Sequence, residues 1–392
     1  MRSPILTAAM LTGALICSAL TPVFGQTLIV GNDEKNGVDQ NFKPVIRPPG
    51  HDTLSVIDLA NPATPKITAT IPLMNSVAGP PVNLAIAPSG DIALVANSLK
   101  PVVEGWGHRL EPDDKVFVVD LKASPPKVIG TVTVGKQPSG LAIDAKGDLA
   151  LVANRADGTI SVLSIHGKDI LVTQTVPVGA ASDQVSAVAI TPDGKRALAT
   201  KPNADKVALL TIDGGKVTYT KHDLPTGIFP YNVAVTPDGK LALTADNGAG
   251  GSSDGNADTV GVIDLAANPP RVIDHVTVGD SPEGLAISPK GDLAVSVQAE
   301  GSNRPPGVFY RHADGDIAVL KIDGDKVTKV GSVTVGALPE AVAFSPDGSR
   351  IYVGNFIDGD LSILKVDGTN VTDTGQRFKM PGHPASMRSG PQ

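Results

Sequence analysis

Short apolar stretches of about 4–8 residues, separated by polar turns, run along the chain from residue 27 onwards. The stretches are rich in Val, Ile, Leu and Thr, and most of these residues favour β-strands. Turn sequences such as Pro192-Asp193-Gly194 and Pro346-Asp347-Gly348 separate them. No stretch after residue 25 repeats its apolar positions with the helical period of 3.6 residues. The pattern therefore predicts an all-β chain.

The stretches recur as one repeated phrase. It reads Pro-x-small-apolar-Ala-apolar, followed by Pro-Asp-Gly or a near copy. An apolar run ending in Ala-Asn follows, then a run similar to Val-Ile-Asp and a run similar to Val-Thr-Val-Gly. The phrase starts at Pro81, Pro138, Val185, Pro230, Pro282 and Pro339. The spacings between these positions are 57, 47, 45, 52 and 57 residues. Four short strands in a repeat of this length are typical of a β-propeller blade.

The two chain ends supply a further blade. Residues 27–32 match a second strand whose first strand is missing, and residues 383–387 match that missing strand. We therefore predict a single all-β domain over residues 26–392, a seven-bladed β-propeller of four-stranded blades. The C-terminal strand would join blade 1 and close the ring, which leaves no open sheet edge between the first and last blades.

Residues 1–25 differ from the repeats and fit a signal peptide. Arg2 is followed by an uncharged apolar run over residues 6–20, and a small residue, Gly25, fits a cleavage site. The sole cysteine, Cys17, lies in this segment, so the mature chain would contain no thiol. We expect export to the periplasm or the exterior, with no membrane span after cleavage.

The formal charge of −7 and the absence of a basic stripe narrow the range of partners. Nucleic acids and anionic membranes attract positively charged surfaces, so neither is an expected partner. A small ligand or a periplasmic protein fits the charge better.

Three strand motifs resemble the signature of the YVTN family of seven-bladed β-propellers. They are Leu94-Val95-Ala96-Asn97, Leu151-Val152-Ala153-Asn154 and Tyr352-Val353-Gly354-Asn355. Relatives with this architecture include surface-layer and periplasmic proteins, lactonases of the phosphogluconolactonase type and propeller subunits associated with redox enzymes. The resemblance thus implies a fold and leaves several activities open. We expect the repeated Asn to hydrogen-bond nearby backbone.

Four insertions break the repeat at the same place in their blades, between the second and third strands. They cover residues 33–52, 98–114, 247–258 and 299–315. These loops lie on one face of a propeller, together with the loops that lead into the innermost strands. Long loops without a role in the repeat are often functional, so we expect the site on this face.

Aromatic and histidine side chains concentrate in the same segments. Aromatic candidates for a ligand or partner surface are Trp106, Tyr231, Phe309 and Tyr310; alternatively they pack the loops against the rim. Histidine candidates for a divalent metal site or for acid–base work are His51, His108, His312 and His383; alternatively they are scattered on the surface.

Glu283 and Glu340 follow the opening Pro of two adjacent blades, where each innermost strand begins. If both face the channel, they form a carboxylate pair that binds a cation or serves acid–base catalysis, with Arg311 as an anion partner. Two functions remain open. One is a scaffold that binds a ligand, a metal or a protein. The other is a lactonase-like hydrolase in which this pair, Arg311 and a histidine open a cyclic ester, with a divalent metal ion as a candidate cofactor.

Overall fold

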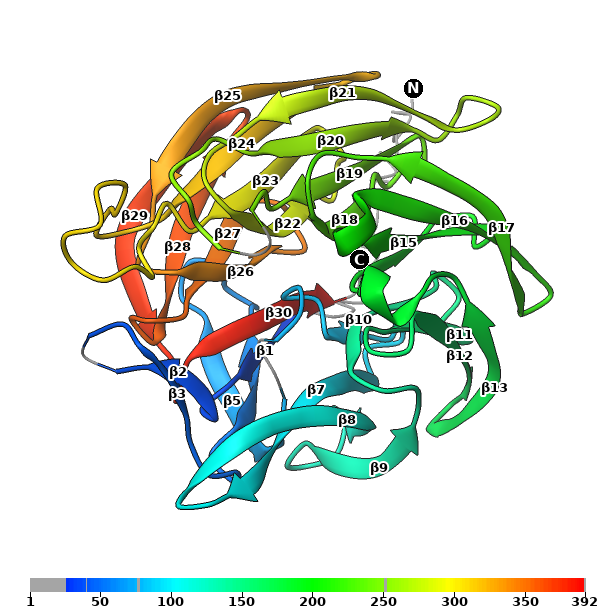
Figure 1. The fold of residues 1–392 in the computed structure, drawn as a ribbon, viewed down its shortest axis with the longest axis horizontal. Coiled ribbons are helices and arrows are strands. Elements are labelled where there is room, and N and C mark those ends of the chain that lie inside the picture. The colour runs from blue at the N-terminus through cyan, green and yellow to red at the C-terminus, as the bar shows by residue number, and fades with distance from the viewer. Residues whose placement is uncertain (1–25, 40, 76–77, 250–251, 391–392) are drawn as a thin grey trace, which may run out of the picture.

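Seven four-stranded antiparallel sheets form a ring around a central axis in a computed structural model of the chain (Figure 1). The structure describes residues 26–39, 41–75, 78–249 and 252–390. The predicted fold class is therefore confirmed. The predicted signal peptide lies outside the described residues. Within them, no helix is both long and apolar enough to cross a membrane.

The strands of each blade follow one another from the centre of the ring outwards. Blade 1 contains β30 (Pro384–Gly390), β1 (Thr27–Asn32), β4 (Thr53–Asp58) and β5 (Lys66–Pro72). Blade 2 contains β6 (Leu84–Ile86), β7 (Ile92–Glu104), β8 (Gly107–Asp120) and β9 (Lys127–Thr133). Blade 3 contains β10 (Pro138–Ile143), β11 (Leu149–Asn154), β12 (Thr159–His166) and β13 (Asp169–Pro177). Blade 4 contains β14 (Val188–Ile190), β15 (Arg196–Lys201), β16 (Lys206–Asp213) and β17 (Lys216–Pro225).

The remaining three blades have the same order. Blade 5 contains β18 (Pro230–Val235), β19 (Leu241–Asp246), β20 (Thr259–Asp264) and β21 (Arg271–Thr277). Blade 6 contains β22 (Pro282–Ile287), β23 (Leu293–Gln298), β24 (Asp316–Asp323) and β25 (Lys326–Thr334). Blade 7 contains β26 (Pro339–Phe344), β27 (Arg350–Asn355), β28 (Asp360–Asp367) and β29 (Asn370–Lys379).

The ring closes as the sequence predicts. β30 pairs antiparallel with β1, with Val30 opposite Met387. Leu28 and Val30 of blade 1 share one buried cluster with Tyr352 of blade 7. The Tyr352 hydroxyl also donates a hydrogen bond of 2.7 Å to the Pro62 carbonyl oxygen. The join is therefore held by strand pairing, apolar packing and a hydrogen bond.

The core consists of apolar layers between neighbouring blades. The second strands are buried on both faces; in β11 every residue is buried. Leu151 and Val162 of blade 3 pack in one cluster with Val188 and Leu210 of blade 4. The outermost strands have only one covered face, so β9 alternates between exposed and partly covered residues. These layers fix where each innermost strand begins.

The repeated Asn side chains bond differently from our expectation. The Asn154 amide donates to the hydroxyls of Thr159 and Ser161, at 2.8 and 2.9 Å, and not to nearby backbone. The Asn355 amide likewise donates to Ser362, at 2.9 Å. Each Asn thus ties the end of a second strand to the third strand of its blade.

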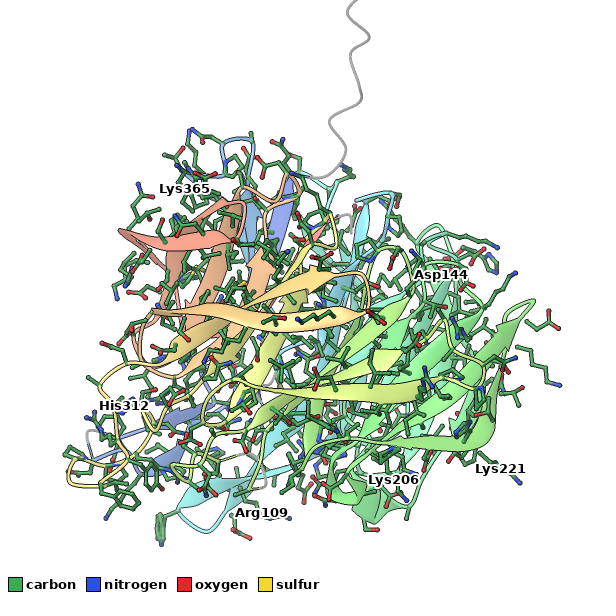
Figure 2. The ribbon with its side chains drawn as sticks, turned by 90° about the horizontal axis from the view of Figure 1, so that it is seen from above. Arg109, Asp144, Lys206, Lys221, His312 and Lys365 are labelled. Carbon is green, nitrogen blue, oxygen red and sulfur yellow. The ribbon has the colours of Figure 1, made fainter. Side chains whose placement is uncertain are left out.

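The insertions form a connected cover on one face, which we call the insertion face. The predicted loop of blade 2 is instead an extension of β7 and β8 into a long arm, and blade 1 carries the hairpin β2 (Asn36–Val38) and β3 (Pro44–Ile46). Figure 2 places Arg109 and His312 on the insertion face, and Asp144 and Lys365 on the opposite face. We call the opposite face the turn face, because the turns after the first and third strands lie there.

Neighbouring insertions contact one another. Arg304 of blade 6 donates to the Ser253 carbonyl oxygen of blade 5, at 3.1 Å through Nε. The Arg311 guanidinium lies 5.0 Å from the ring centroid of Phe42 in the blade 1 insertion. Strand β3 of that insertion also contacts β8 of blade 2. The cover therefore runs from blade 5 to blade 2 and passes over blade 7.

Candidate functional site

Glu283 and Glu340 come together at the insertion-face end of the innermost strands, as the repeat predicts. They are the second residues of β22 and β26, and their exposed fractions are 9% and 6%. The two carboxyl groups are hydrogen-bonded to each other. One of them must therefore carry the proton, because a carboxylate can only accept.

The pKa of Glu340 is raised more clearly than that of Glu283. Burial, the nearby Glu283 charge and the hydrogen bond with Glu283 raise the pKa of Glu340 well above its usual range. Burial also raises the pKa of Glu283, but the hydrogen bond from Glu340 acts in the opposite direction and favours the Glu283 carboxylate. The pair thus contains one neutral acid and one base in hydrogen-bond contact.

A glycine lets the two strands approach closely enough for this contact. A Cβ at Gly284 would lie against the backbone carbonyl oxygen of Glu340. The same feature recurs in blade 3, where a Cβ at Gly140 would stand 2.7 Å from the Ser186 carbonyl oxygen. The glycine after Glu283 therefore allows adjacent blades to bring their carboxyl groups together.

The equivalent residues of the other blades continue the ring around the channel. In blade order, the second position of the innermost strand is occupied by Ala385, Val82, Ser139, Ser186, Tyr231, Glu283 and Glu340, all of which are buried. The polar members are consecutive, from blade 3 to blade 7, whereas blades 1 and 2 contribute apolar side chains. The channel mouth therefore has a polar arc that ends in the two carboxyl groups.

Tyr231 is the neighbour of the pair within this arc. Burial and the charges of Glu283 and Glu340 raise the pKa of its hydroxyl above the usual range, which keeps it protonated. Its ring lies 5.9 Å from the guanidinium carbon of Arg155 and stacks on Phe229 with a centroid distance of 5.9 Å. The Gln184 side-chain oxygen accepts from Arg155 at 2.6 Å. Arg155 was not predicted, because its short loop looks like an ordinary turn.

A buried cluster of one lysine and two aspartates in the blade 1 insertion acts electrostatically on Glu340. Lys35 is fully buried, and its Nζ lies 2.8 Å from Asp52 Oδ2 and 3.2 Å from Asp33 Oδ1. The negative charge of Asp33 contributes to the raised pKa of Glu340. The blade 1 insertion therefore helps to raise the pKa of Glu340 through the charge of Asp33, a residue that the sequence analysis did not select.

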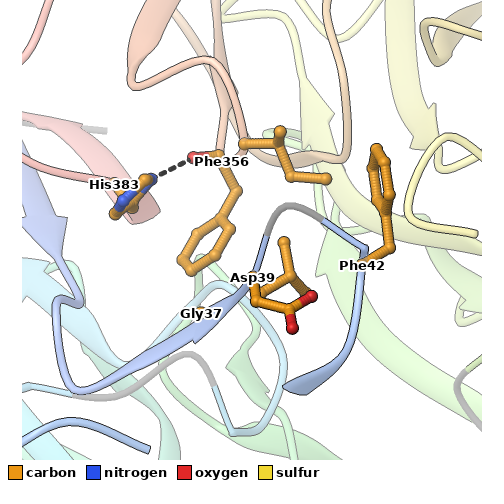
Figure 3. A pocket seen from close by; sticks show the side chains of 7 residues that line it. Gly37, Asp39, Phe42, Phe356 and His383 are labelled. Atoms are coloured by element: carbon orange, nitrogen blue, oxygen red, sulfur yellow. Dashed lines mark hydrogen bonds between the residues drawn. The ribbon is translucent and has the colours of Figure 1, made fainter. Parts of the chain in front are cut away.

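A cavity of 310 Å³ opens between the blade 1 insertion and blade 7 (Figure 3). Its walls include Val38, Phe42, Phe356 and His383. His383 Nδ1 lies 2.6 Å from the Phe356 carbonyl oxygen, which can only accept, so this nitrogen carries a proton. Nε2 faces Glu34 at 3.9 Å. Phe356 also packs in one buried cluster with Ala385, the blade 1 residue equivalent to Glu340.

The four histidines do not come together as the predicted metal site. His51 and His312 are exposed in different insertions, His108 lies on the blade 2 arm, and His383 lines the cavity. Within the part of the chain that the structure describes, no group of three or more His, Cys, Asp or Glu side chains is arranged to hold a metal ion. The arm carries His108 outwards along β8, which separates it from His383.

Arg311 also differs from its predicted place beside Glu283. Its guanidinium lies over Phe42, and its Nε donates to the Arg304 carbonyl oxygen at 2.7 Å. No ion pair joins Arg311 to a carboxylate of the described residues. Arg311 therefore connects the blade 6 insertion to the blade 1 insertion. Arg155, which lies over the Tyr231 ring, is the arginine near the channel mouth.

The predicted aromatic surface divides into two groups. Trp106, in the turn of the blade 2 arm, and Phe309, within the blade 6 insertion, are fully or almost fully exposed, at 108% and 94%. Tyr310 is partly buried and meets Phe309 edge to face at 5.1 Å. Tyr231 is buried at the channel mouth and does not belong to the exposed surface.

Comparisons with known proteins identify similar folds at low sequence identity. No protein-family model and no curated protein matches this chain, so the resemblance to the YVTN family stays a prediction. A functionally unknown protein from Desulfotomaculum acetoxidans superposes with a TM-score of 0.67 at 15% identity, over 93% of this chain and 98% of that one. A protein described as a "putative 6-phosphogluconolactonase" from Bacteroides uniformis gives 0.69 at 16% identity, over 92% and 98%.

A third similar structure is a periplasmic gluconolactonase from Pseudomonas aeruginosa. It superposes with a TM-score of 0.63 at 19% identity, over 92% of this chain and 98% of that one. Identities this low establish the fold alone. The chain is accordingly a seven-bladed β-propeller whose fold is similar to that of lactonase-like propellers.

Proposed function

We propose that this protein hydrolyses a small lactone at the channel mouth of the insertion face, with Glu283 and Glu340 as its acid–base pair. The observation that carries the proposal is the hydrogen bond between these two buried carboxyl groups. Burying two acids next to each other destabilises the fold, and a protein that serves only as a scaffold would gain nothing from this destabilisation. Such strongly perturbed pairs concentrate at functional sites.

The pair supplies both proton transfers that ester hydrolysis requires. The Glu283 carboxylate takes a proton from water while the water oxygen attacks the lactone carbonyl carbon. Glu340 then gives its proton to the ring oxygen as the carbon–oxygen bond breaks, which yields a hydroxy acid. The neutral Tyr231 hydroxyl donates a hydrogen bond to the carbonyl oxygen, where negative charge develops.

The substrate class follows from the polar arc and from the similar structures. Serine, tyrosine and carboxyl groups line the mouth, and they suit a ligand with several hydroxyl groups. Two of the similar structures have names that refer to sugar lactones. An aldonolactone is therefore the proposed substrate, and the predicted signal peptide leads us to propose the periplasm as the place of action.

The test is lactone hydrolysis by the purified protein. D-Glucono-1,5-lactone is hydrolysed at constant pH 6.5, base uptake is recorded, and the uncatalysed rate is subtracted. We expect E283Q and E340Q each to lower kcat/KM by at least about 100-fold, because general acid–base catalysis contributes roughly 10²–10⁴-fold. The matched control is E104Q, which changes an exposed glutamate at the end of the blade 2 arm. No hydrolysis by the wild type, or a loss below twofold in both variants, would exclude the proposal.

A protein-binding scaffold is the second candidate function, and the exposed side chains of Trp106 and Phe309 favour it. Large aromatic side chains this exposed are typical of contact surfaces. Photo-crosslinking from position 106 in intact cells is expected to give one discrete adduct, and crosslinking from Lys365 on the turn face is the control. Equal, diffuse labelling from both positions would remove this candidate.

A further inference from the structure

The turn-face end of the central channel contains a second cavity, of 480 Å³. Its wall consists of the ends of the innermost strands and the first residues of the turns that follow. Large apolar side chains of the wall include those of Ile86, Ile143, Ile190, Val235, Ile287 and Phe344. The carboxyl pair lies at the strand starts, whereas this wall lies at the strand ends. The cavity is therefore separate from the site of the proposed hydrolysis.

The repeat is broken at one position of this wall. Three residues after the ring position at the channel mouth, the innermost strand carries alanine in six blades: Ala85, Ala142, Ala189, Ala234, Ala286 and Ala343. In blade 1 the equivalent residue is Arg388, which pairs with Ile29. In six blades this position carries only the small side chain of alanine, whereas in blade 1 it carries the long, positively charged side chain of Arg388.

Arg388 is partly buried and lines the cavity without a partner. Its guanidinium makes no hydrogen bond or ion pair with any residue that the structure describes. Burial lowers the pKa of Arg388 to about 10, and no neighbouring acid counteracts this effect. A guanidinium without a counter-ion in apolar surroundings costs free energy unless an anion reaches it.

Asp144 is the other charged residue among the described residues of the wall. Its Oδ1 accepts hydrogen bonds from the backbone N–H groups of Gly147, Asp148 and Leu149, at 3.0, 3.1 and 3.1 Å. This carboxyl group holds its own turn together and forms no ion pair with Arg388. The cation therefore stays available to a ligand.

We propose that this cavity binds a small monocarboxylate with an apolar body, with Arg388 as the residue that holds its carboxylate. The planar guanidinium can donate two parallel hydrogen bonds to one carboxylate. The isoleucine and alanine side chains of the wall would cover the body of the ligand. An inorganic anion would satisfy the charge but leave the apolar wall in contact with water.

The experiment is calorimetric titration of the full mature protein with octanoate at pH 7. Octan-1-ol tests the need for the charge, and inorganic phosphate tests the need for the apolar body. We expect octanoate to bind, and R388M to weaken binding at least tenfold, which corresponds to about 1.4 kcal/mol. R388K should be intermediate, because an ammonium lacks the planar fork. The matched control R271M changes an exposed arginine of β21 and should bind as the wild type does.

Folding is monitored by thermal unfolding without ligand. R388M should unfold no earlier than the wild type, because it replaces an unpaired, partly buried charge with an apolar side chain. Octanoate should raise the melting temperature of the wild type and leave that of R388M unchanged. Octanoate binding that survives in R388M, equal affinity for octan-1-ol, or equal affinity for phosphate would each overturn the proposal.

Discussion

Glu283 and Glu340 are hydrogen-bonded to each other although they belong to different blades. Their contact results from the repeat itself, because each occupies the second position of an innermost strand and Gly284 lets the strands approach. The same position contains serine or a small apolar residue in four of the other five blades, and Tyr231 in the fifth. The pair is thus a local departure from the small residues that most blades carry at this position.

The pair should make stability depend on pH in a way that E340Q removes. The pKa of Glu340 is raised in the folded state above its ordinary value of 4.5, so the folded chain binds the proton more tightly than the unfolded chain. This contribution to stability is fully present below pH 4.5 and is lost as pH rises towards the raised pKa. The loss reaches about 1.4 kcal/mol for each pH unit within that window.

Glutamine is neutral at every pH and can still donate to Glu283. The stability of E340Q relative to the wild type should therefore increase as pH rises above 4.5, in urea unfolding followed by circular dichroism. E104Q, with an exposed side chain, serves as the control and should show no such trend. A difference between E340Q and the wild type that stays constant with pH would show that Glu340 ionises normally.

Lys35 should be essential for the blade 1 insertion. K35M leaves Asp33 and Asp52 buried without their cation, and breaking a buried ion pair costs about 3–5 kcal/mol. The free energy of unfolding in urea measures this loss. K321M, which removes an ion pair of Lys321 with an exposed Asp323, should change it by less than about 1 kcal/mol. Equal effects of the two substitutions would contradict a buried cluster.

Tyr352 should contribute to ring closure through its hydroxyl. Y352F keeps the ring in the cluster of blades 1 and 7 but removes the hydrogen bond to the Pro62 carbonyl oxygen. A typical intramolecular hydrogen bond contributes about 0.5–1.5 kcal/mol, so unfolding should be easier by that amount. Y310F, which alters a partly buried tyrosine on the insertion face, is the comparison and should be close to neutral.

Trp106 should report on the insertion face alone, because it is the only tryptophan of the chain and is fully exposed. Its fluorescence should resemble that of free tryptophan in water and be quenched efficiently by iodide. W106A should leave the free energy of unfolding within about 0.5 kcal/mol of the wild type. Emission typical of an apolar environment would mean that the blade 2 arm folds back onto the propeller.

The repeat allows the fold and the carboxyl pair to be predicted, because equivalent residues of a propeller occupy equivalent places. Residues 27–32 and 383–387 predict the closure, and the position after each opening Pro places Glu283 beside Glu340. Arg388 could have been found by the same alignment of blades, since it replaces alanine at a wall position.

The insertions follow no repeat, and their conformations depend on contacts that the sequence pattern does not display. The grouping of His108 with His383 is wrong because β7 and β8 continue as a paired arm. Arg311 lies over Phe42, and not beside Glu283, because the blade 6 insertion contacts the blade 1 insertion. Arg155 was missed because it belongs to a turn that is short and regular in sequence.

The shared proton of Glu283 and Glu340 is the central claim, and infrared spectroscopy measures it directly. At pH 7 the wild type is expected to show the C=O band of a protonated carboxyl group, with a shift in D₂O, and E340Q should lack that band. E104Q should retain it. A wild-type spectrum equal to that of E340Q at pH 7 would mean that both carboxyl groups are ionised, and it would contradict the acid–base pair.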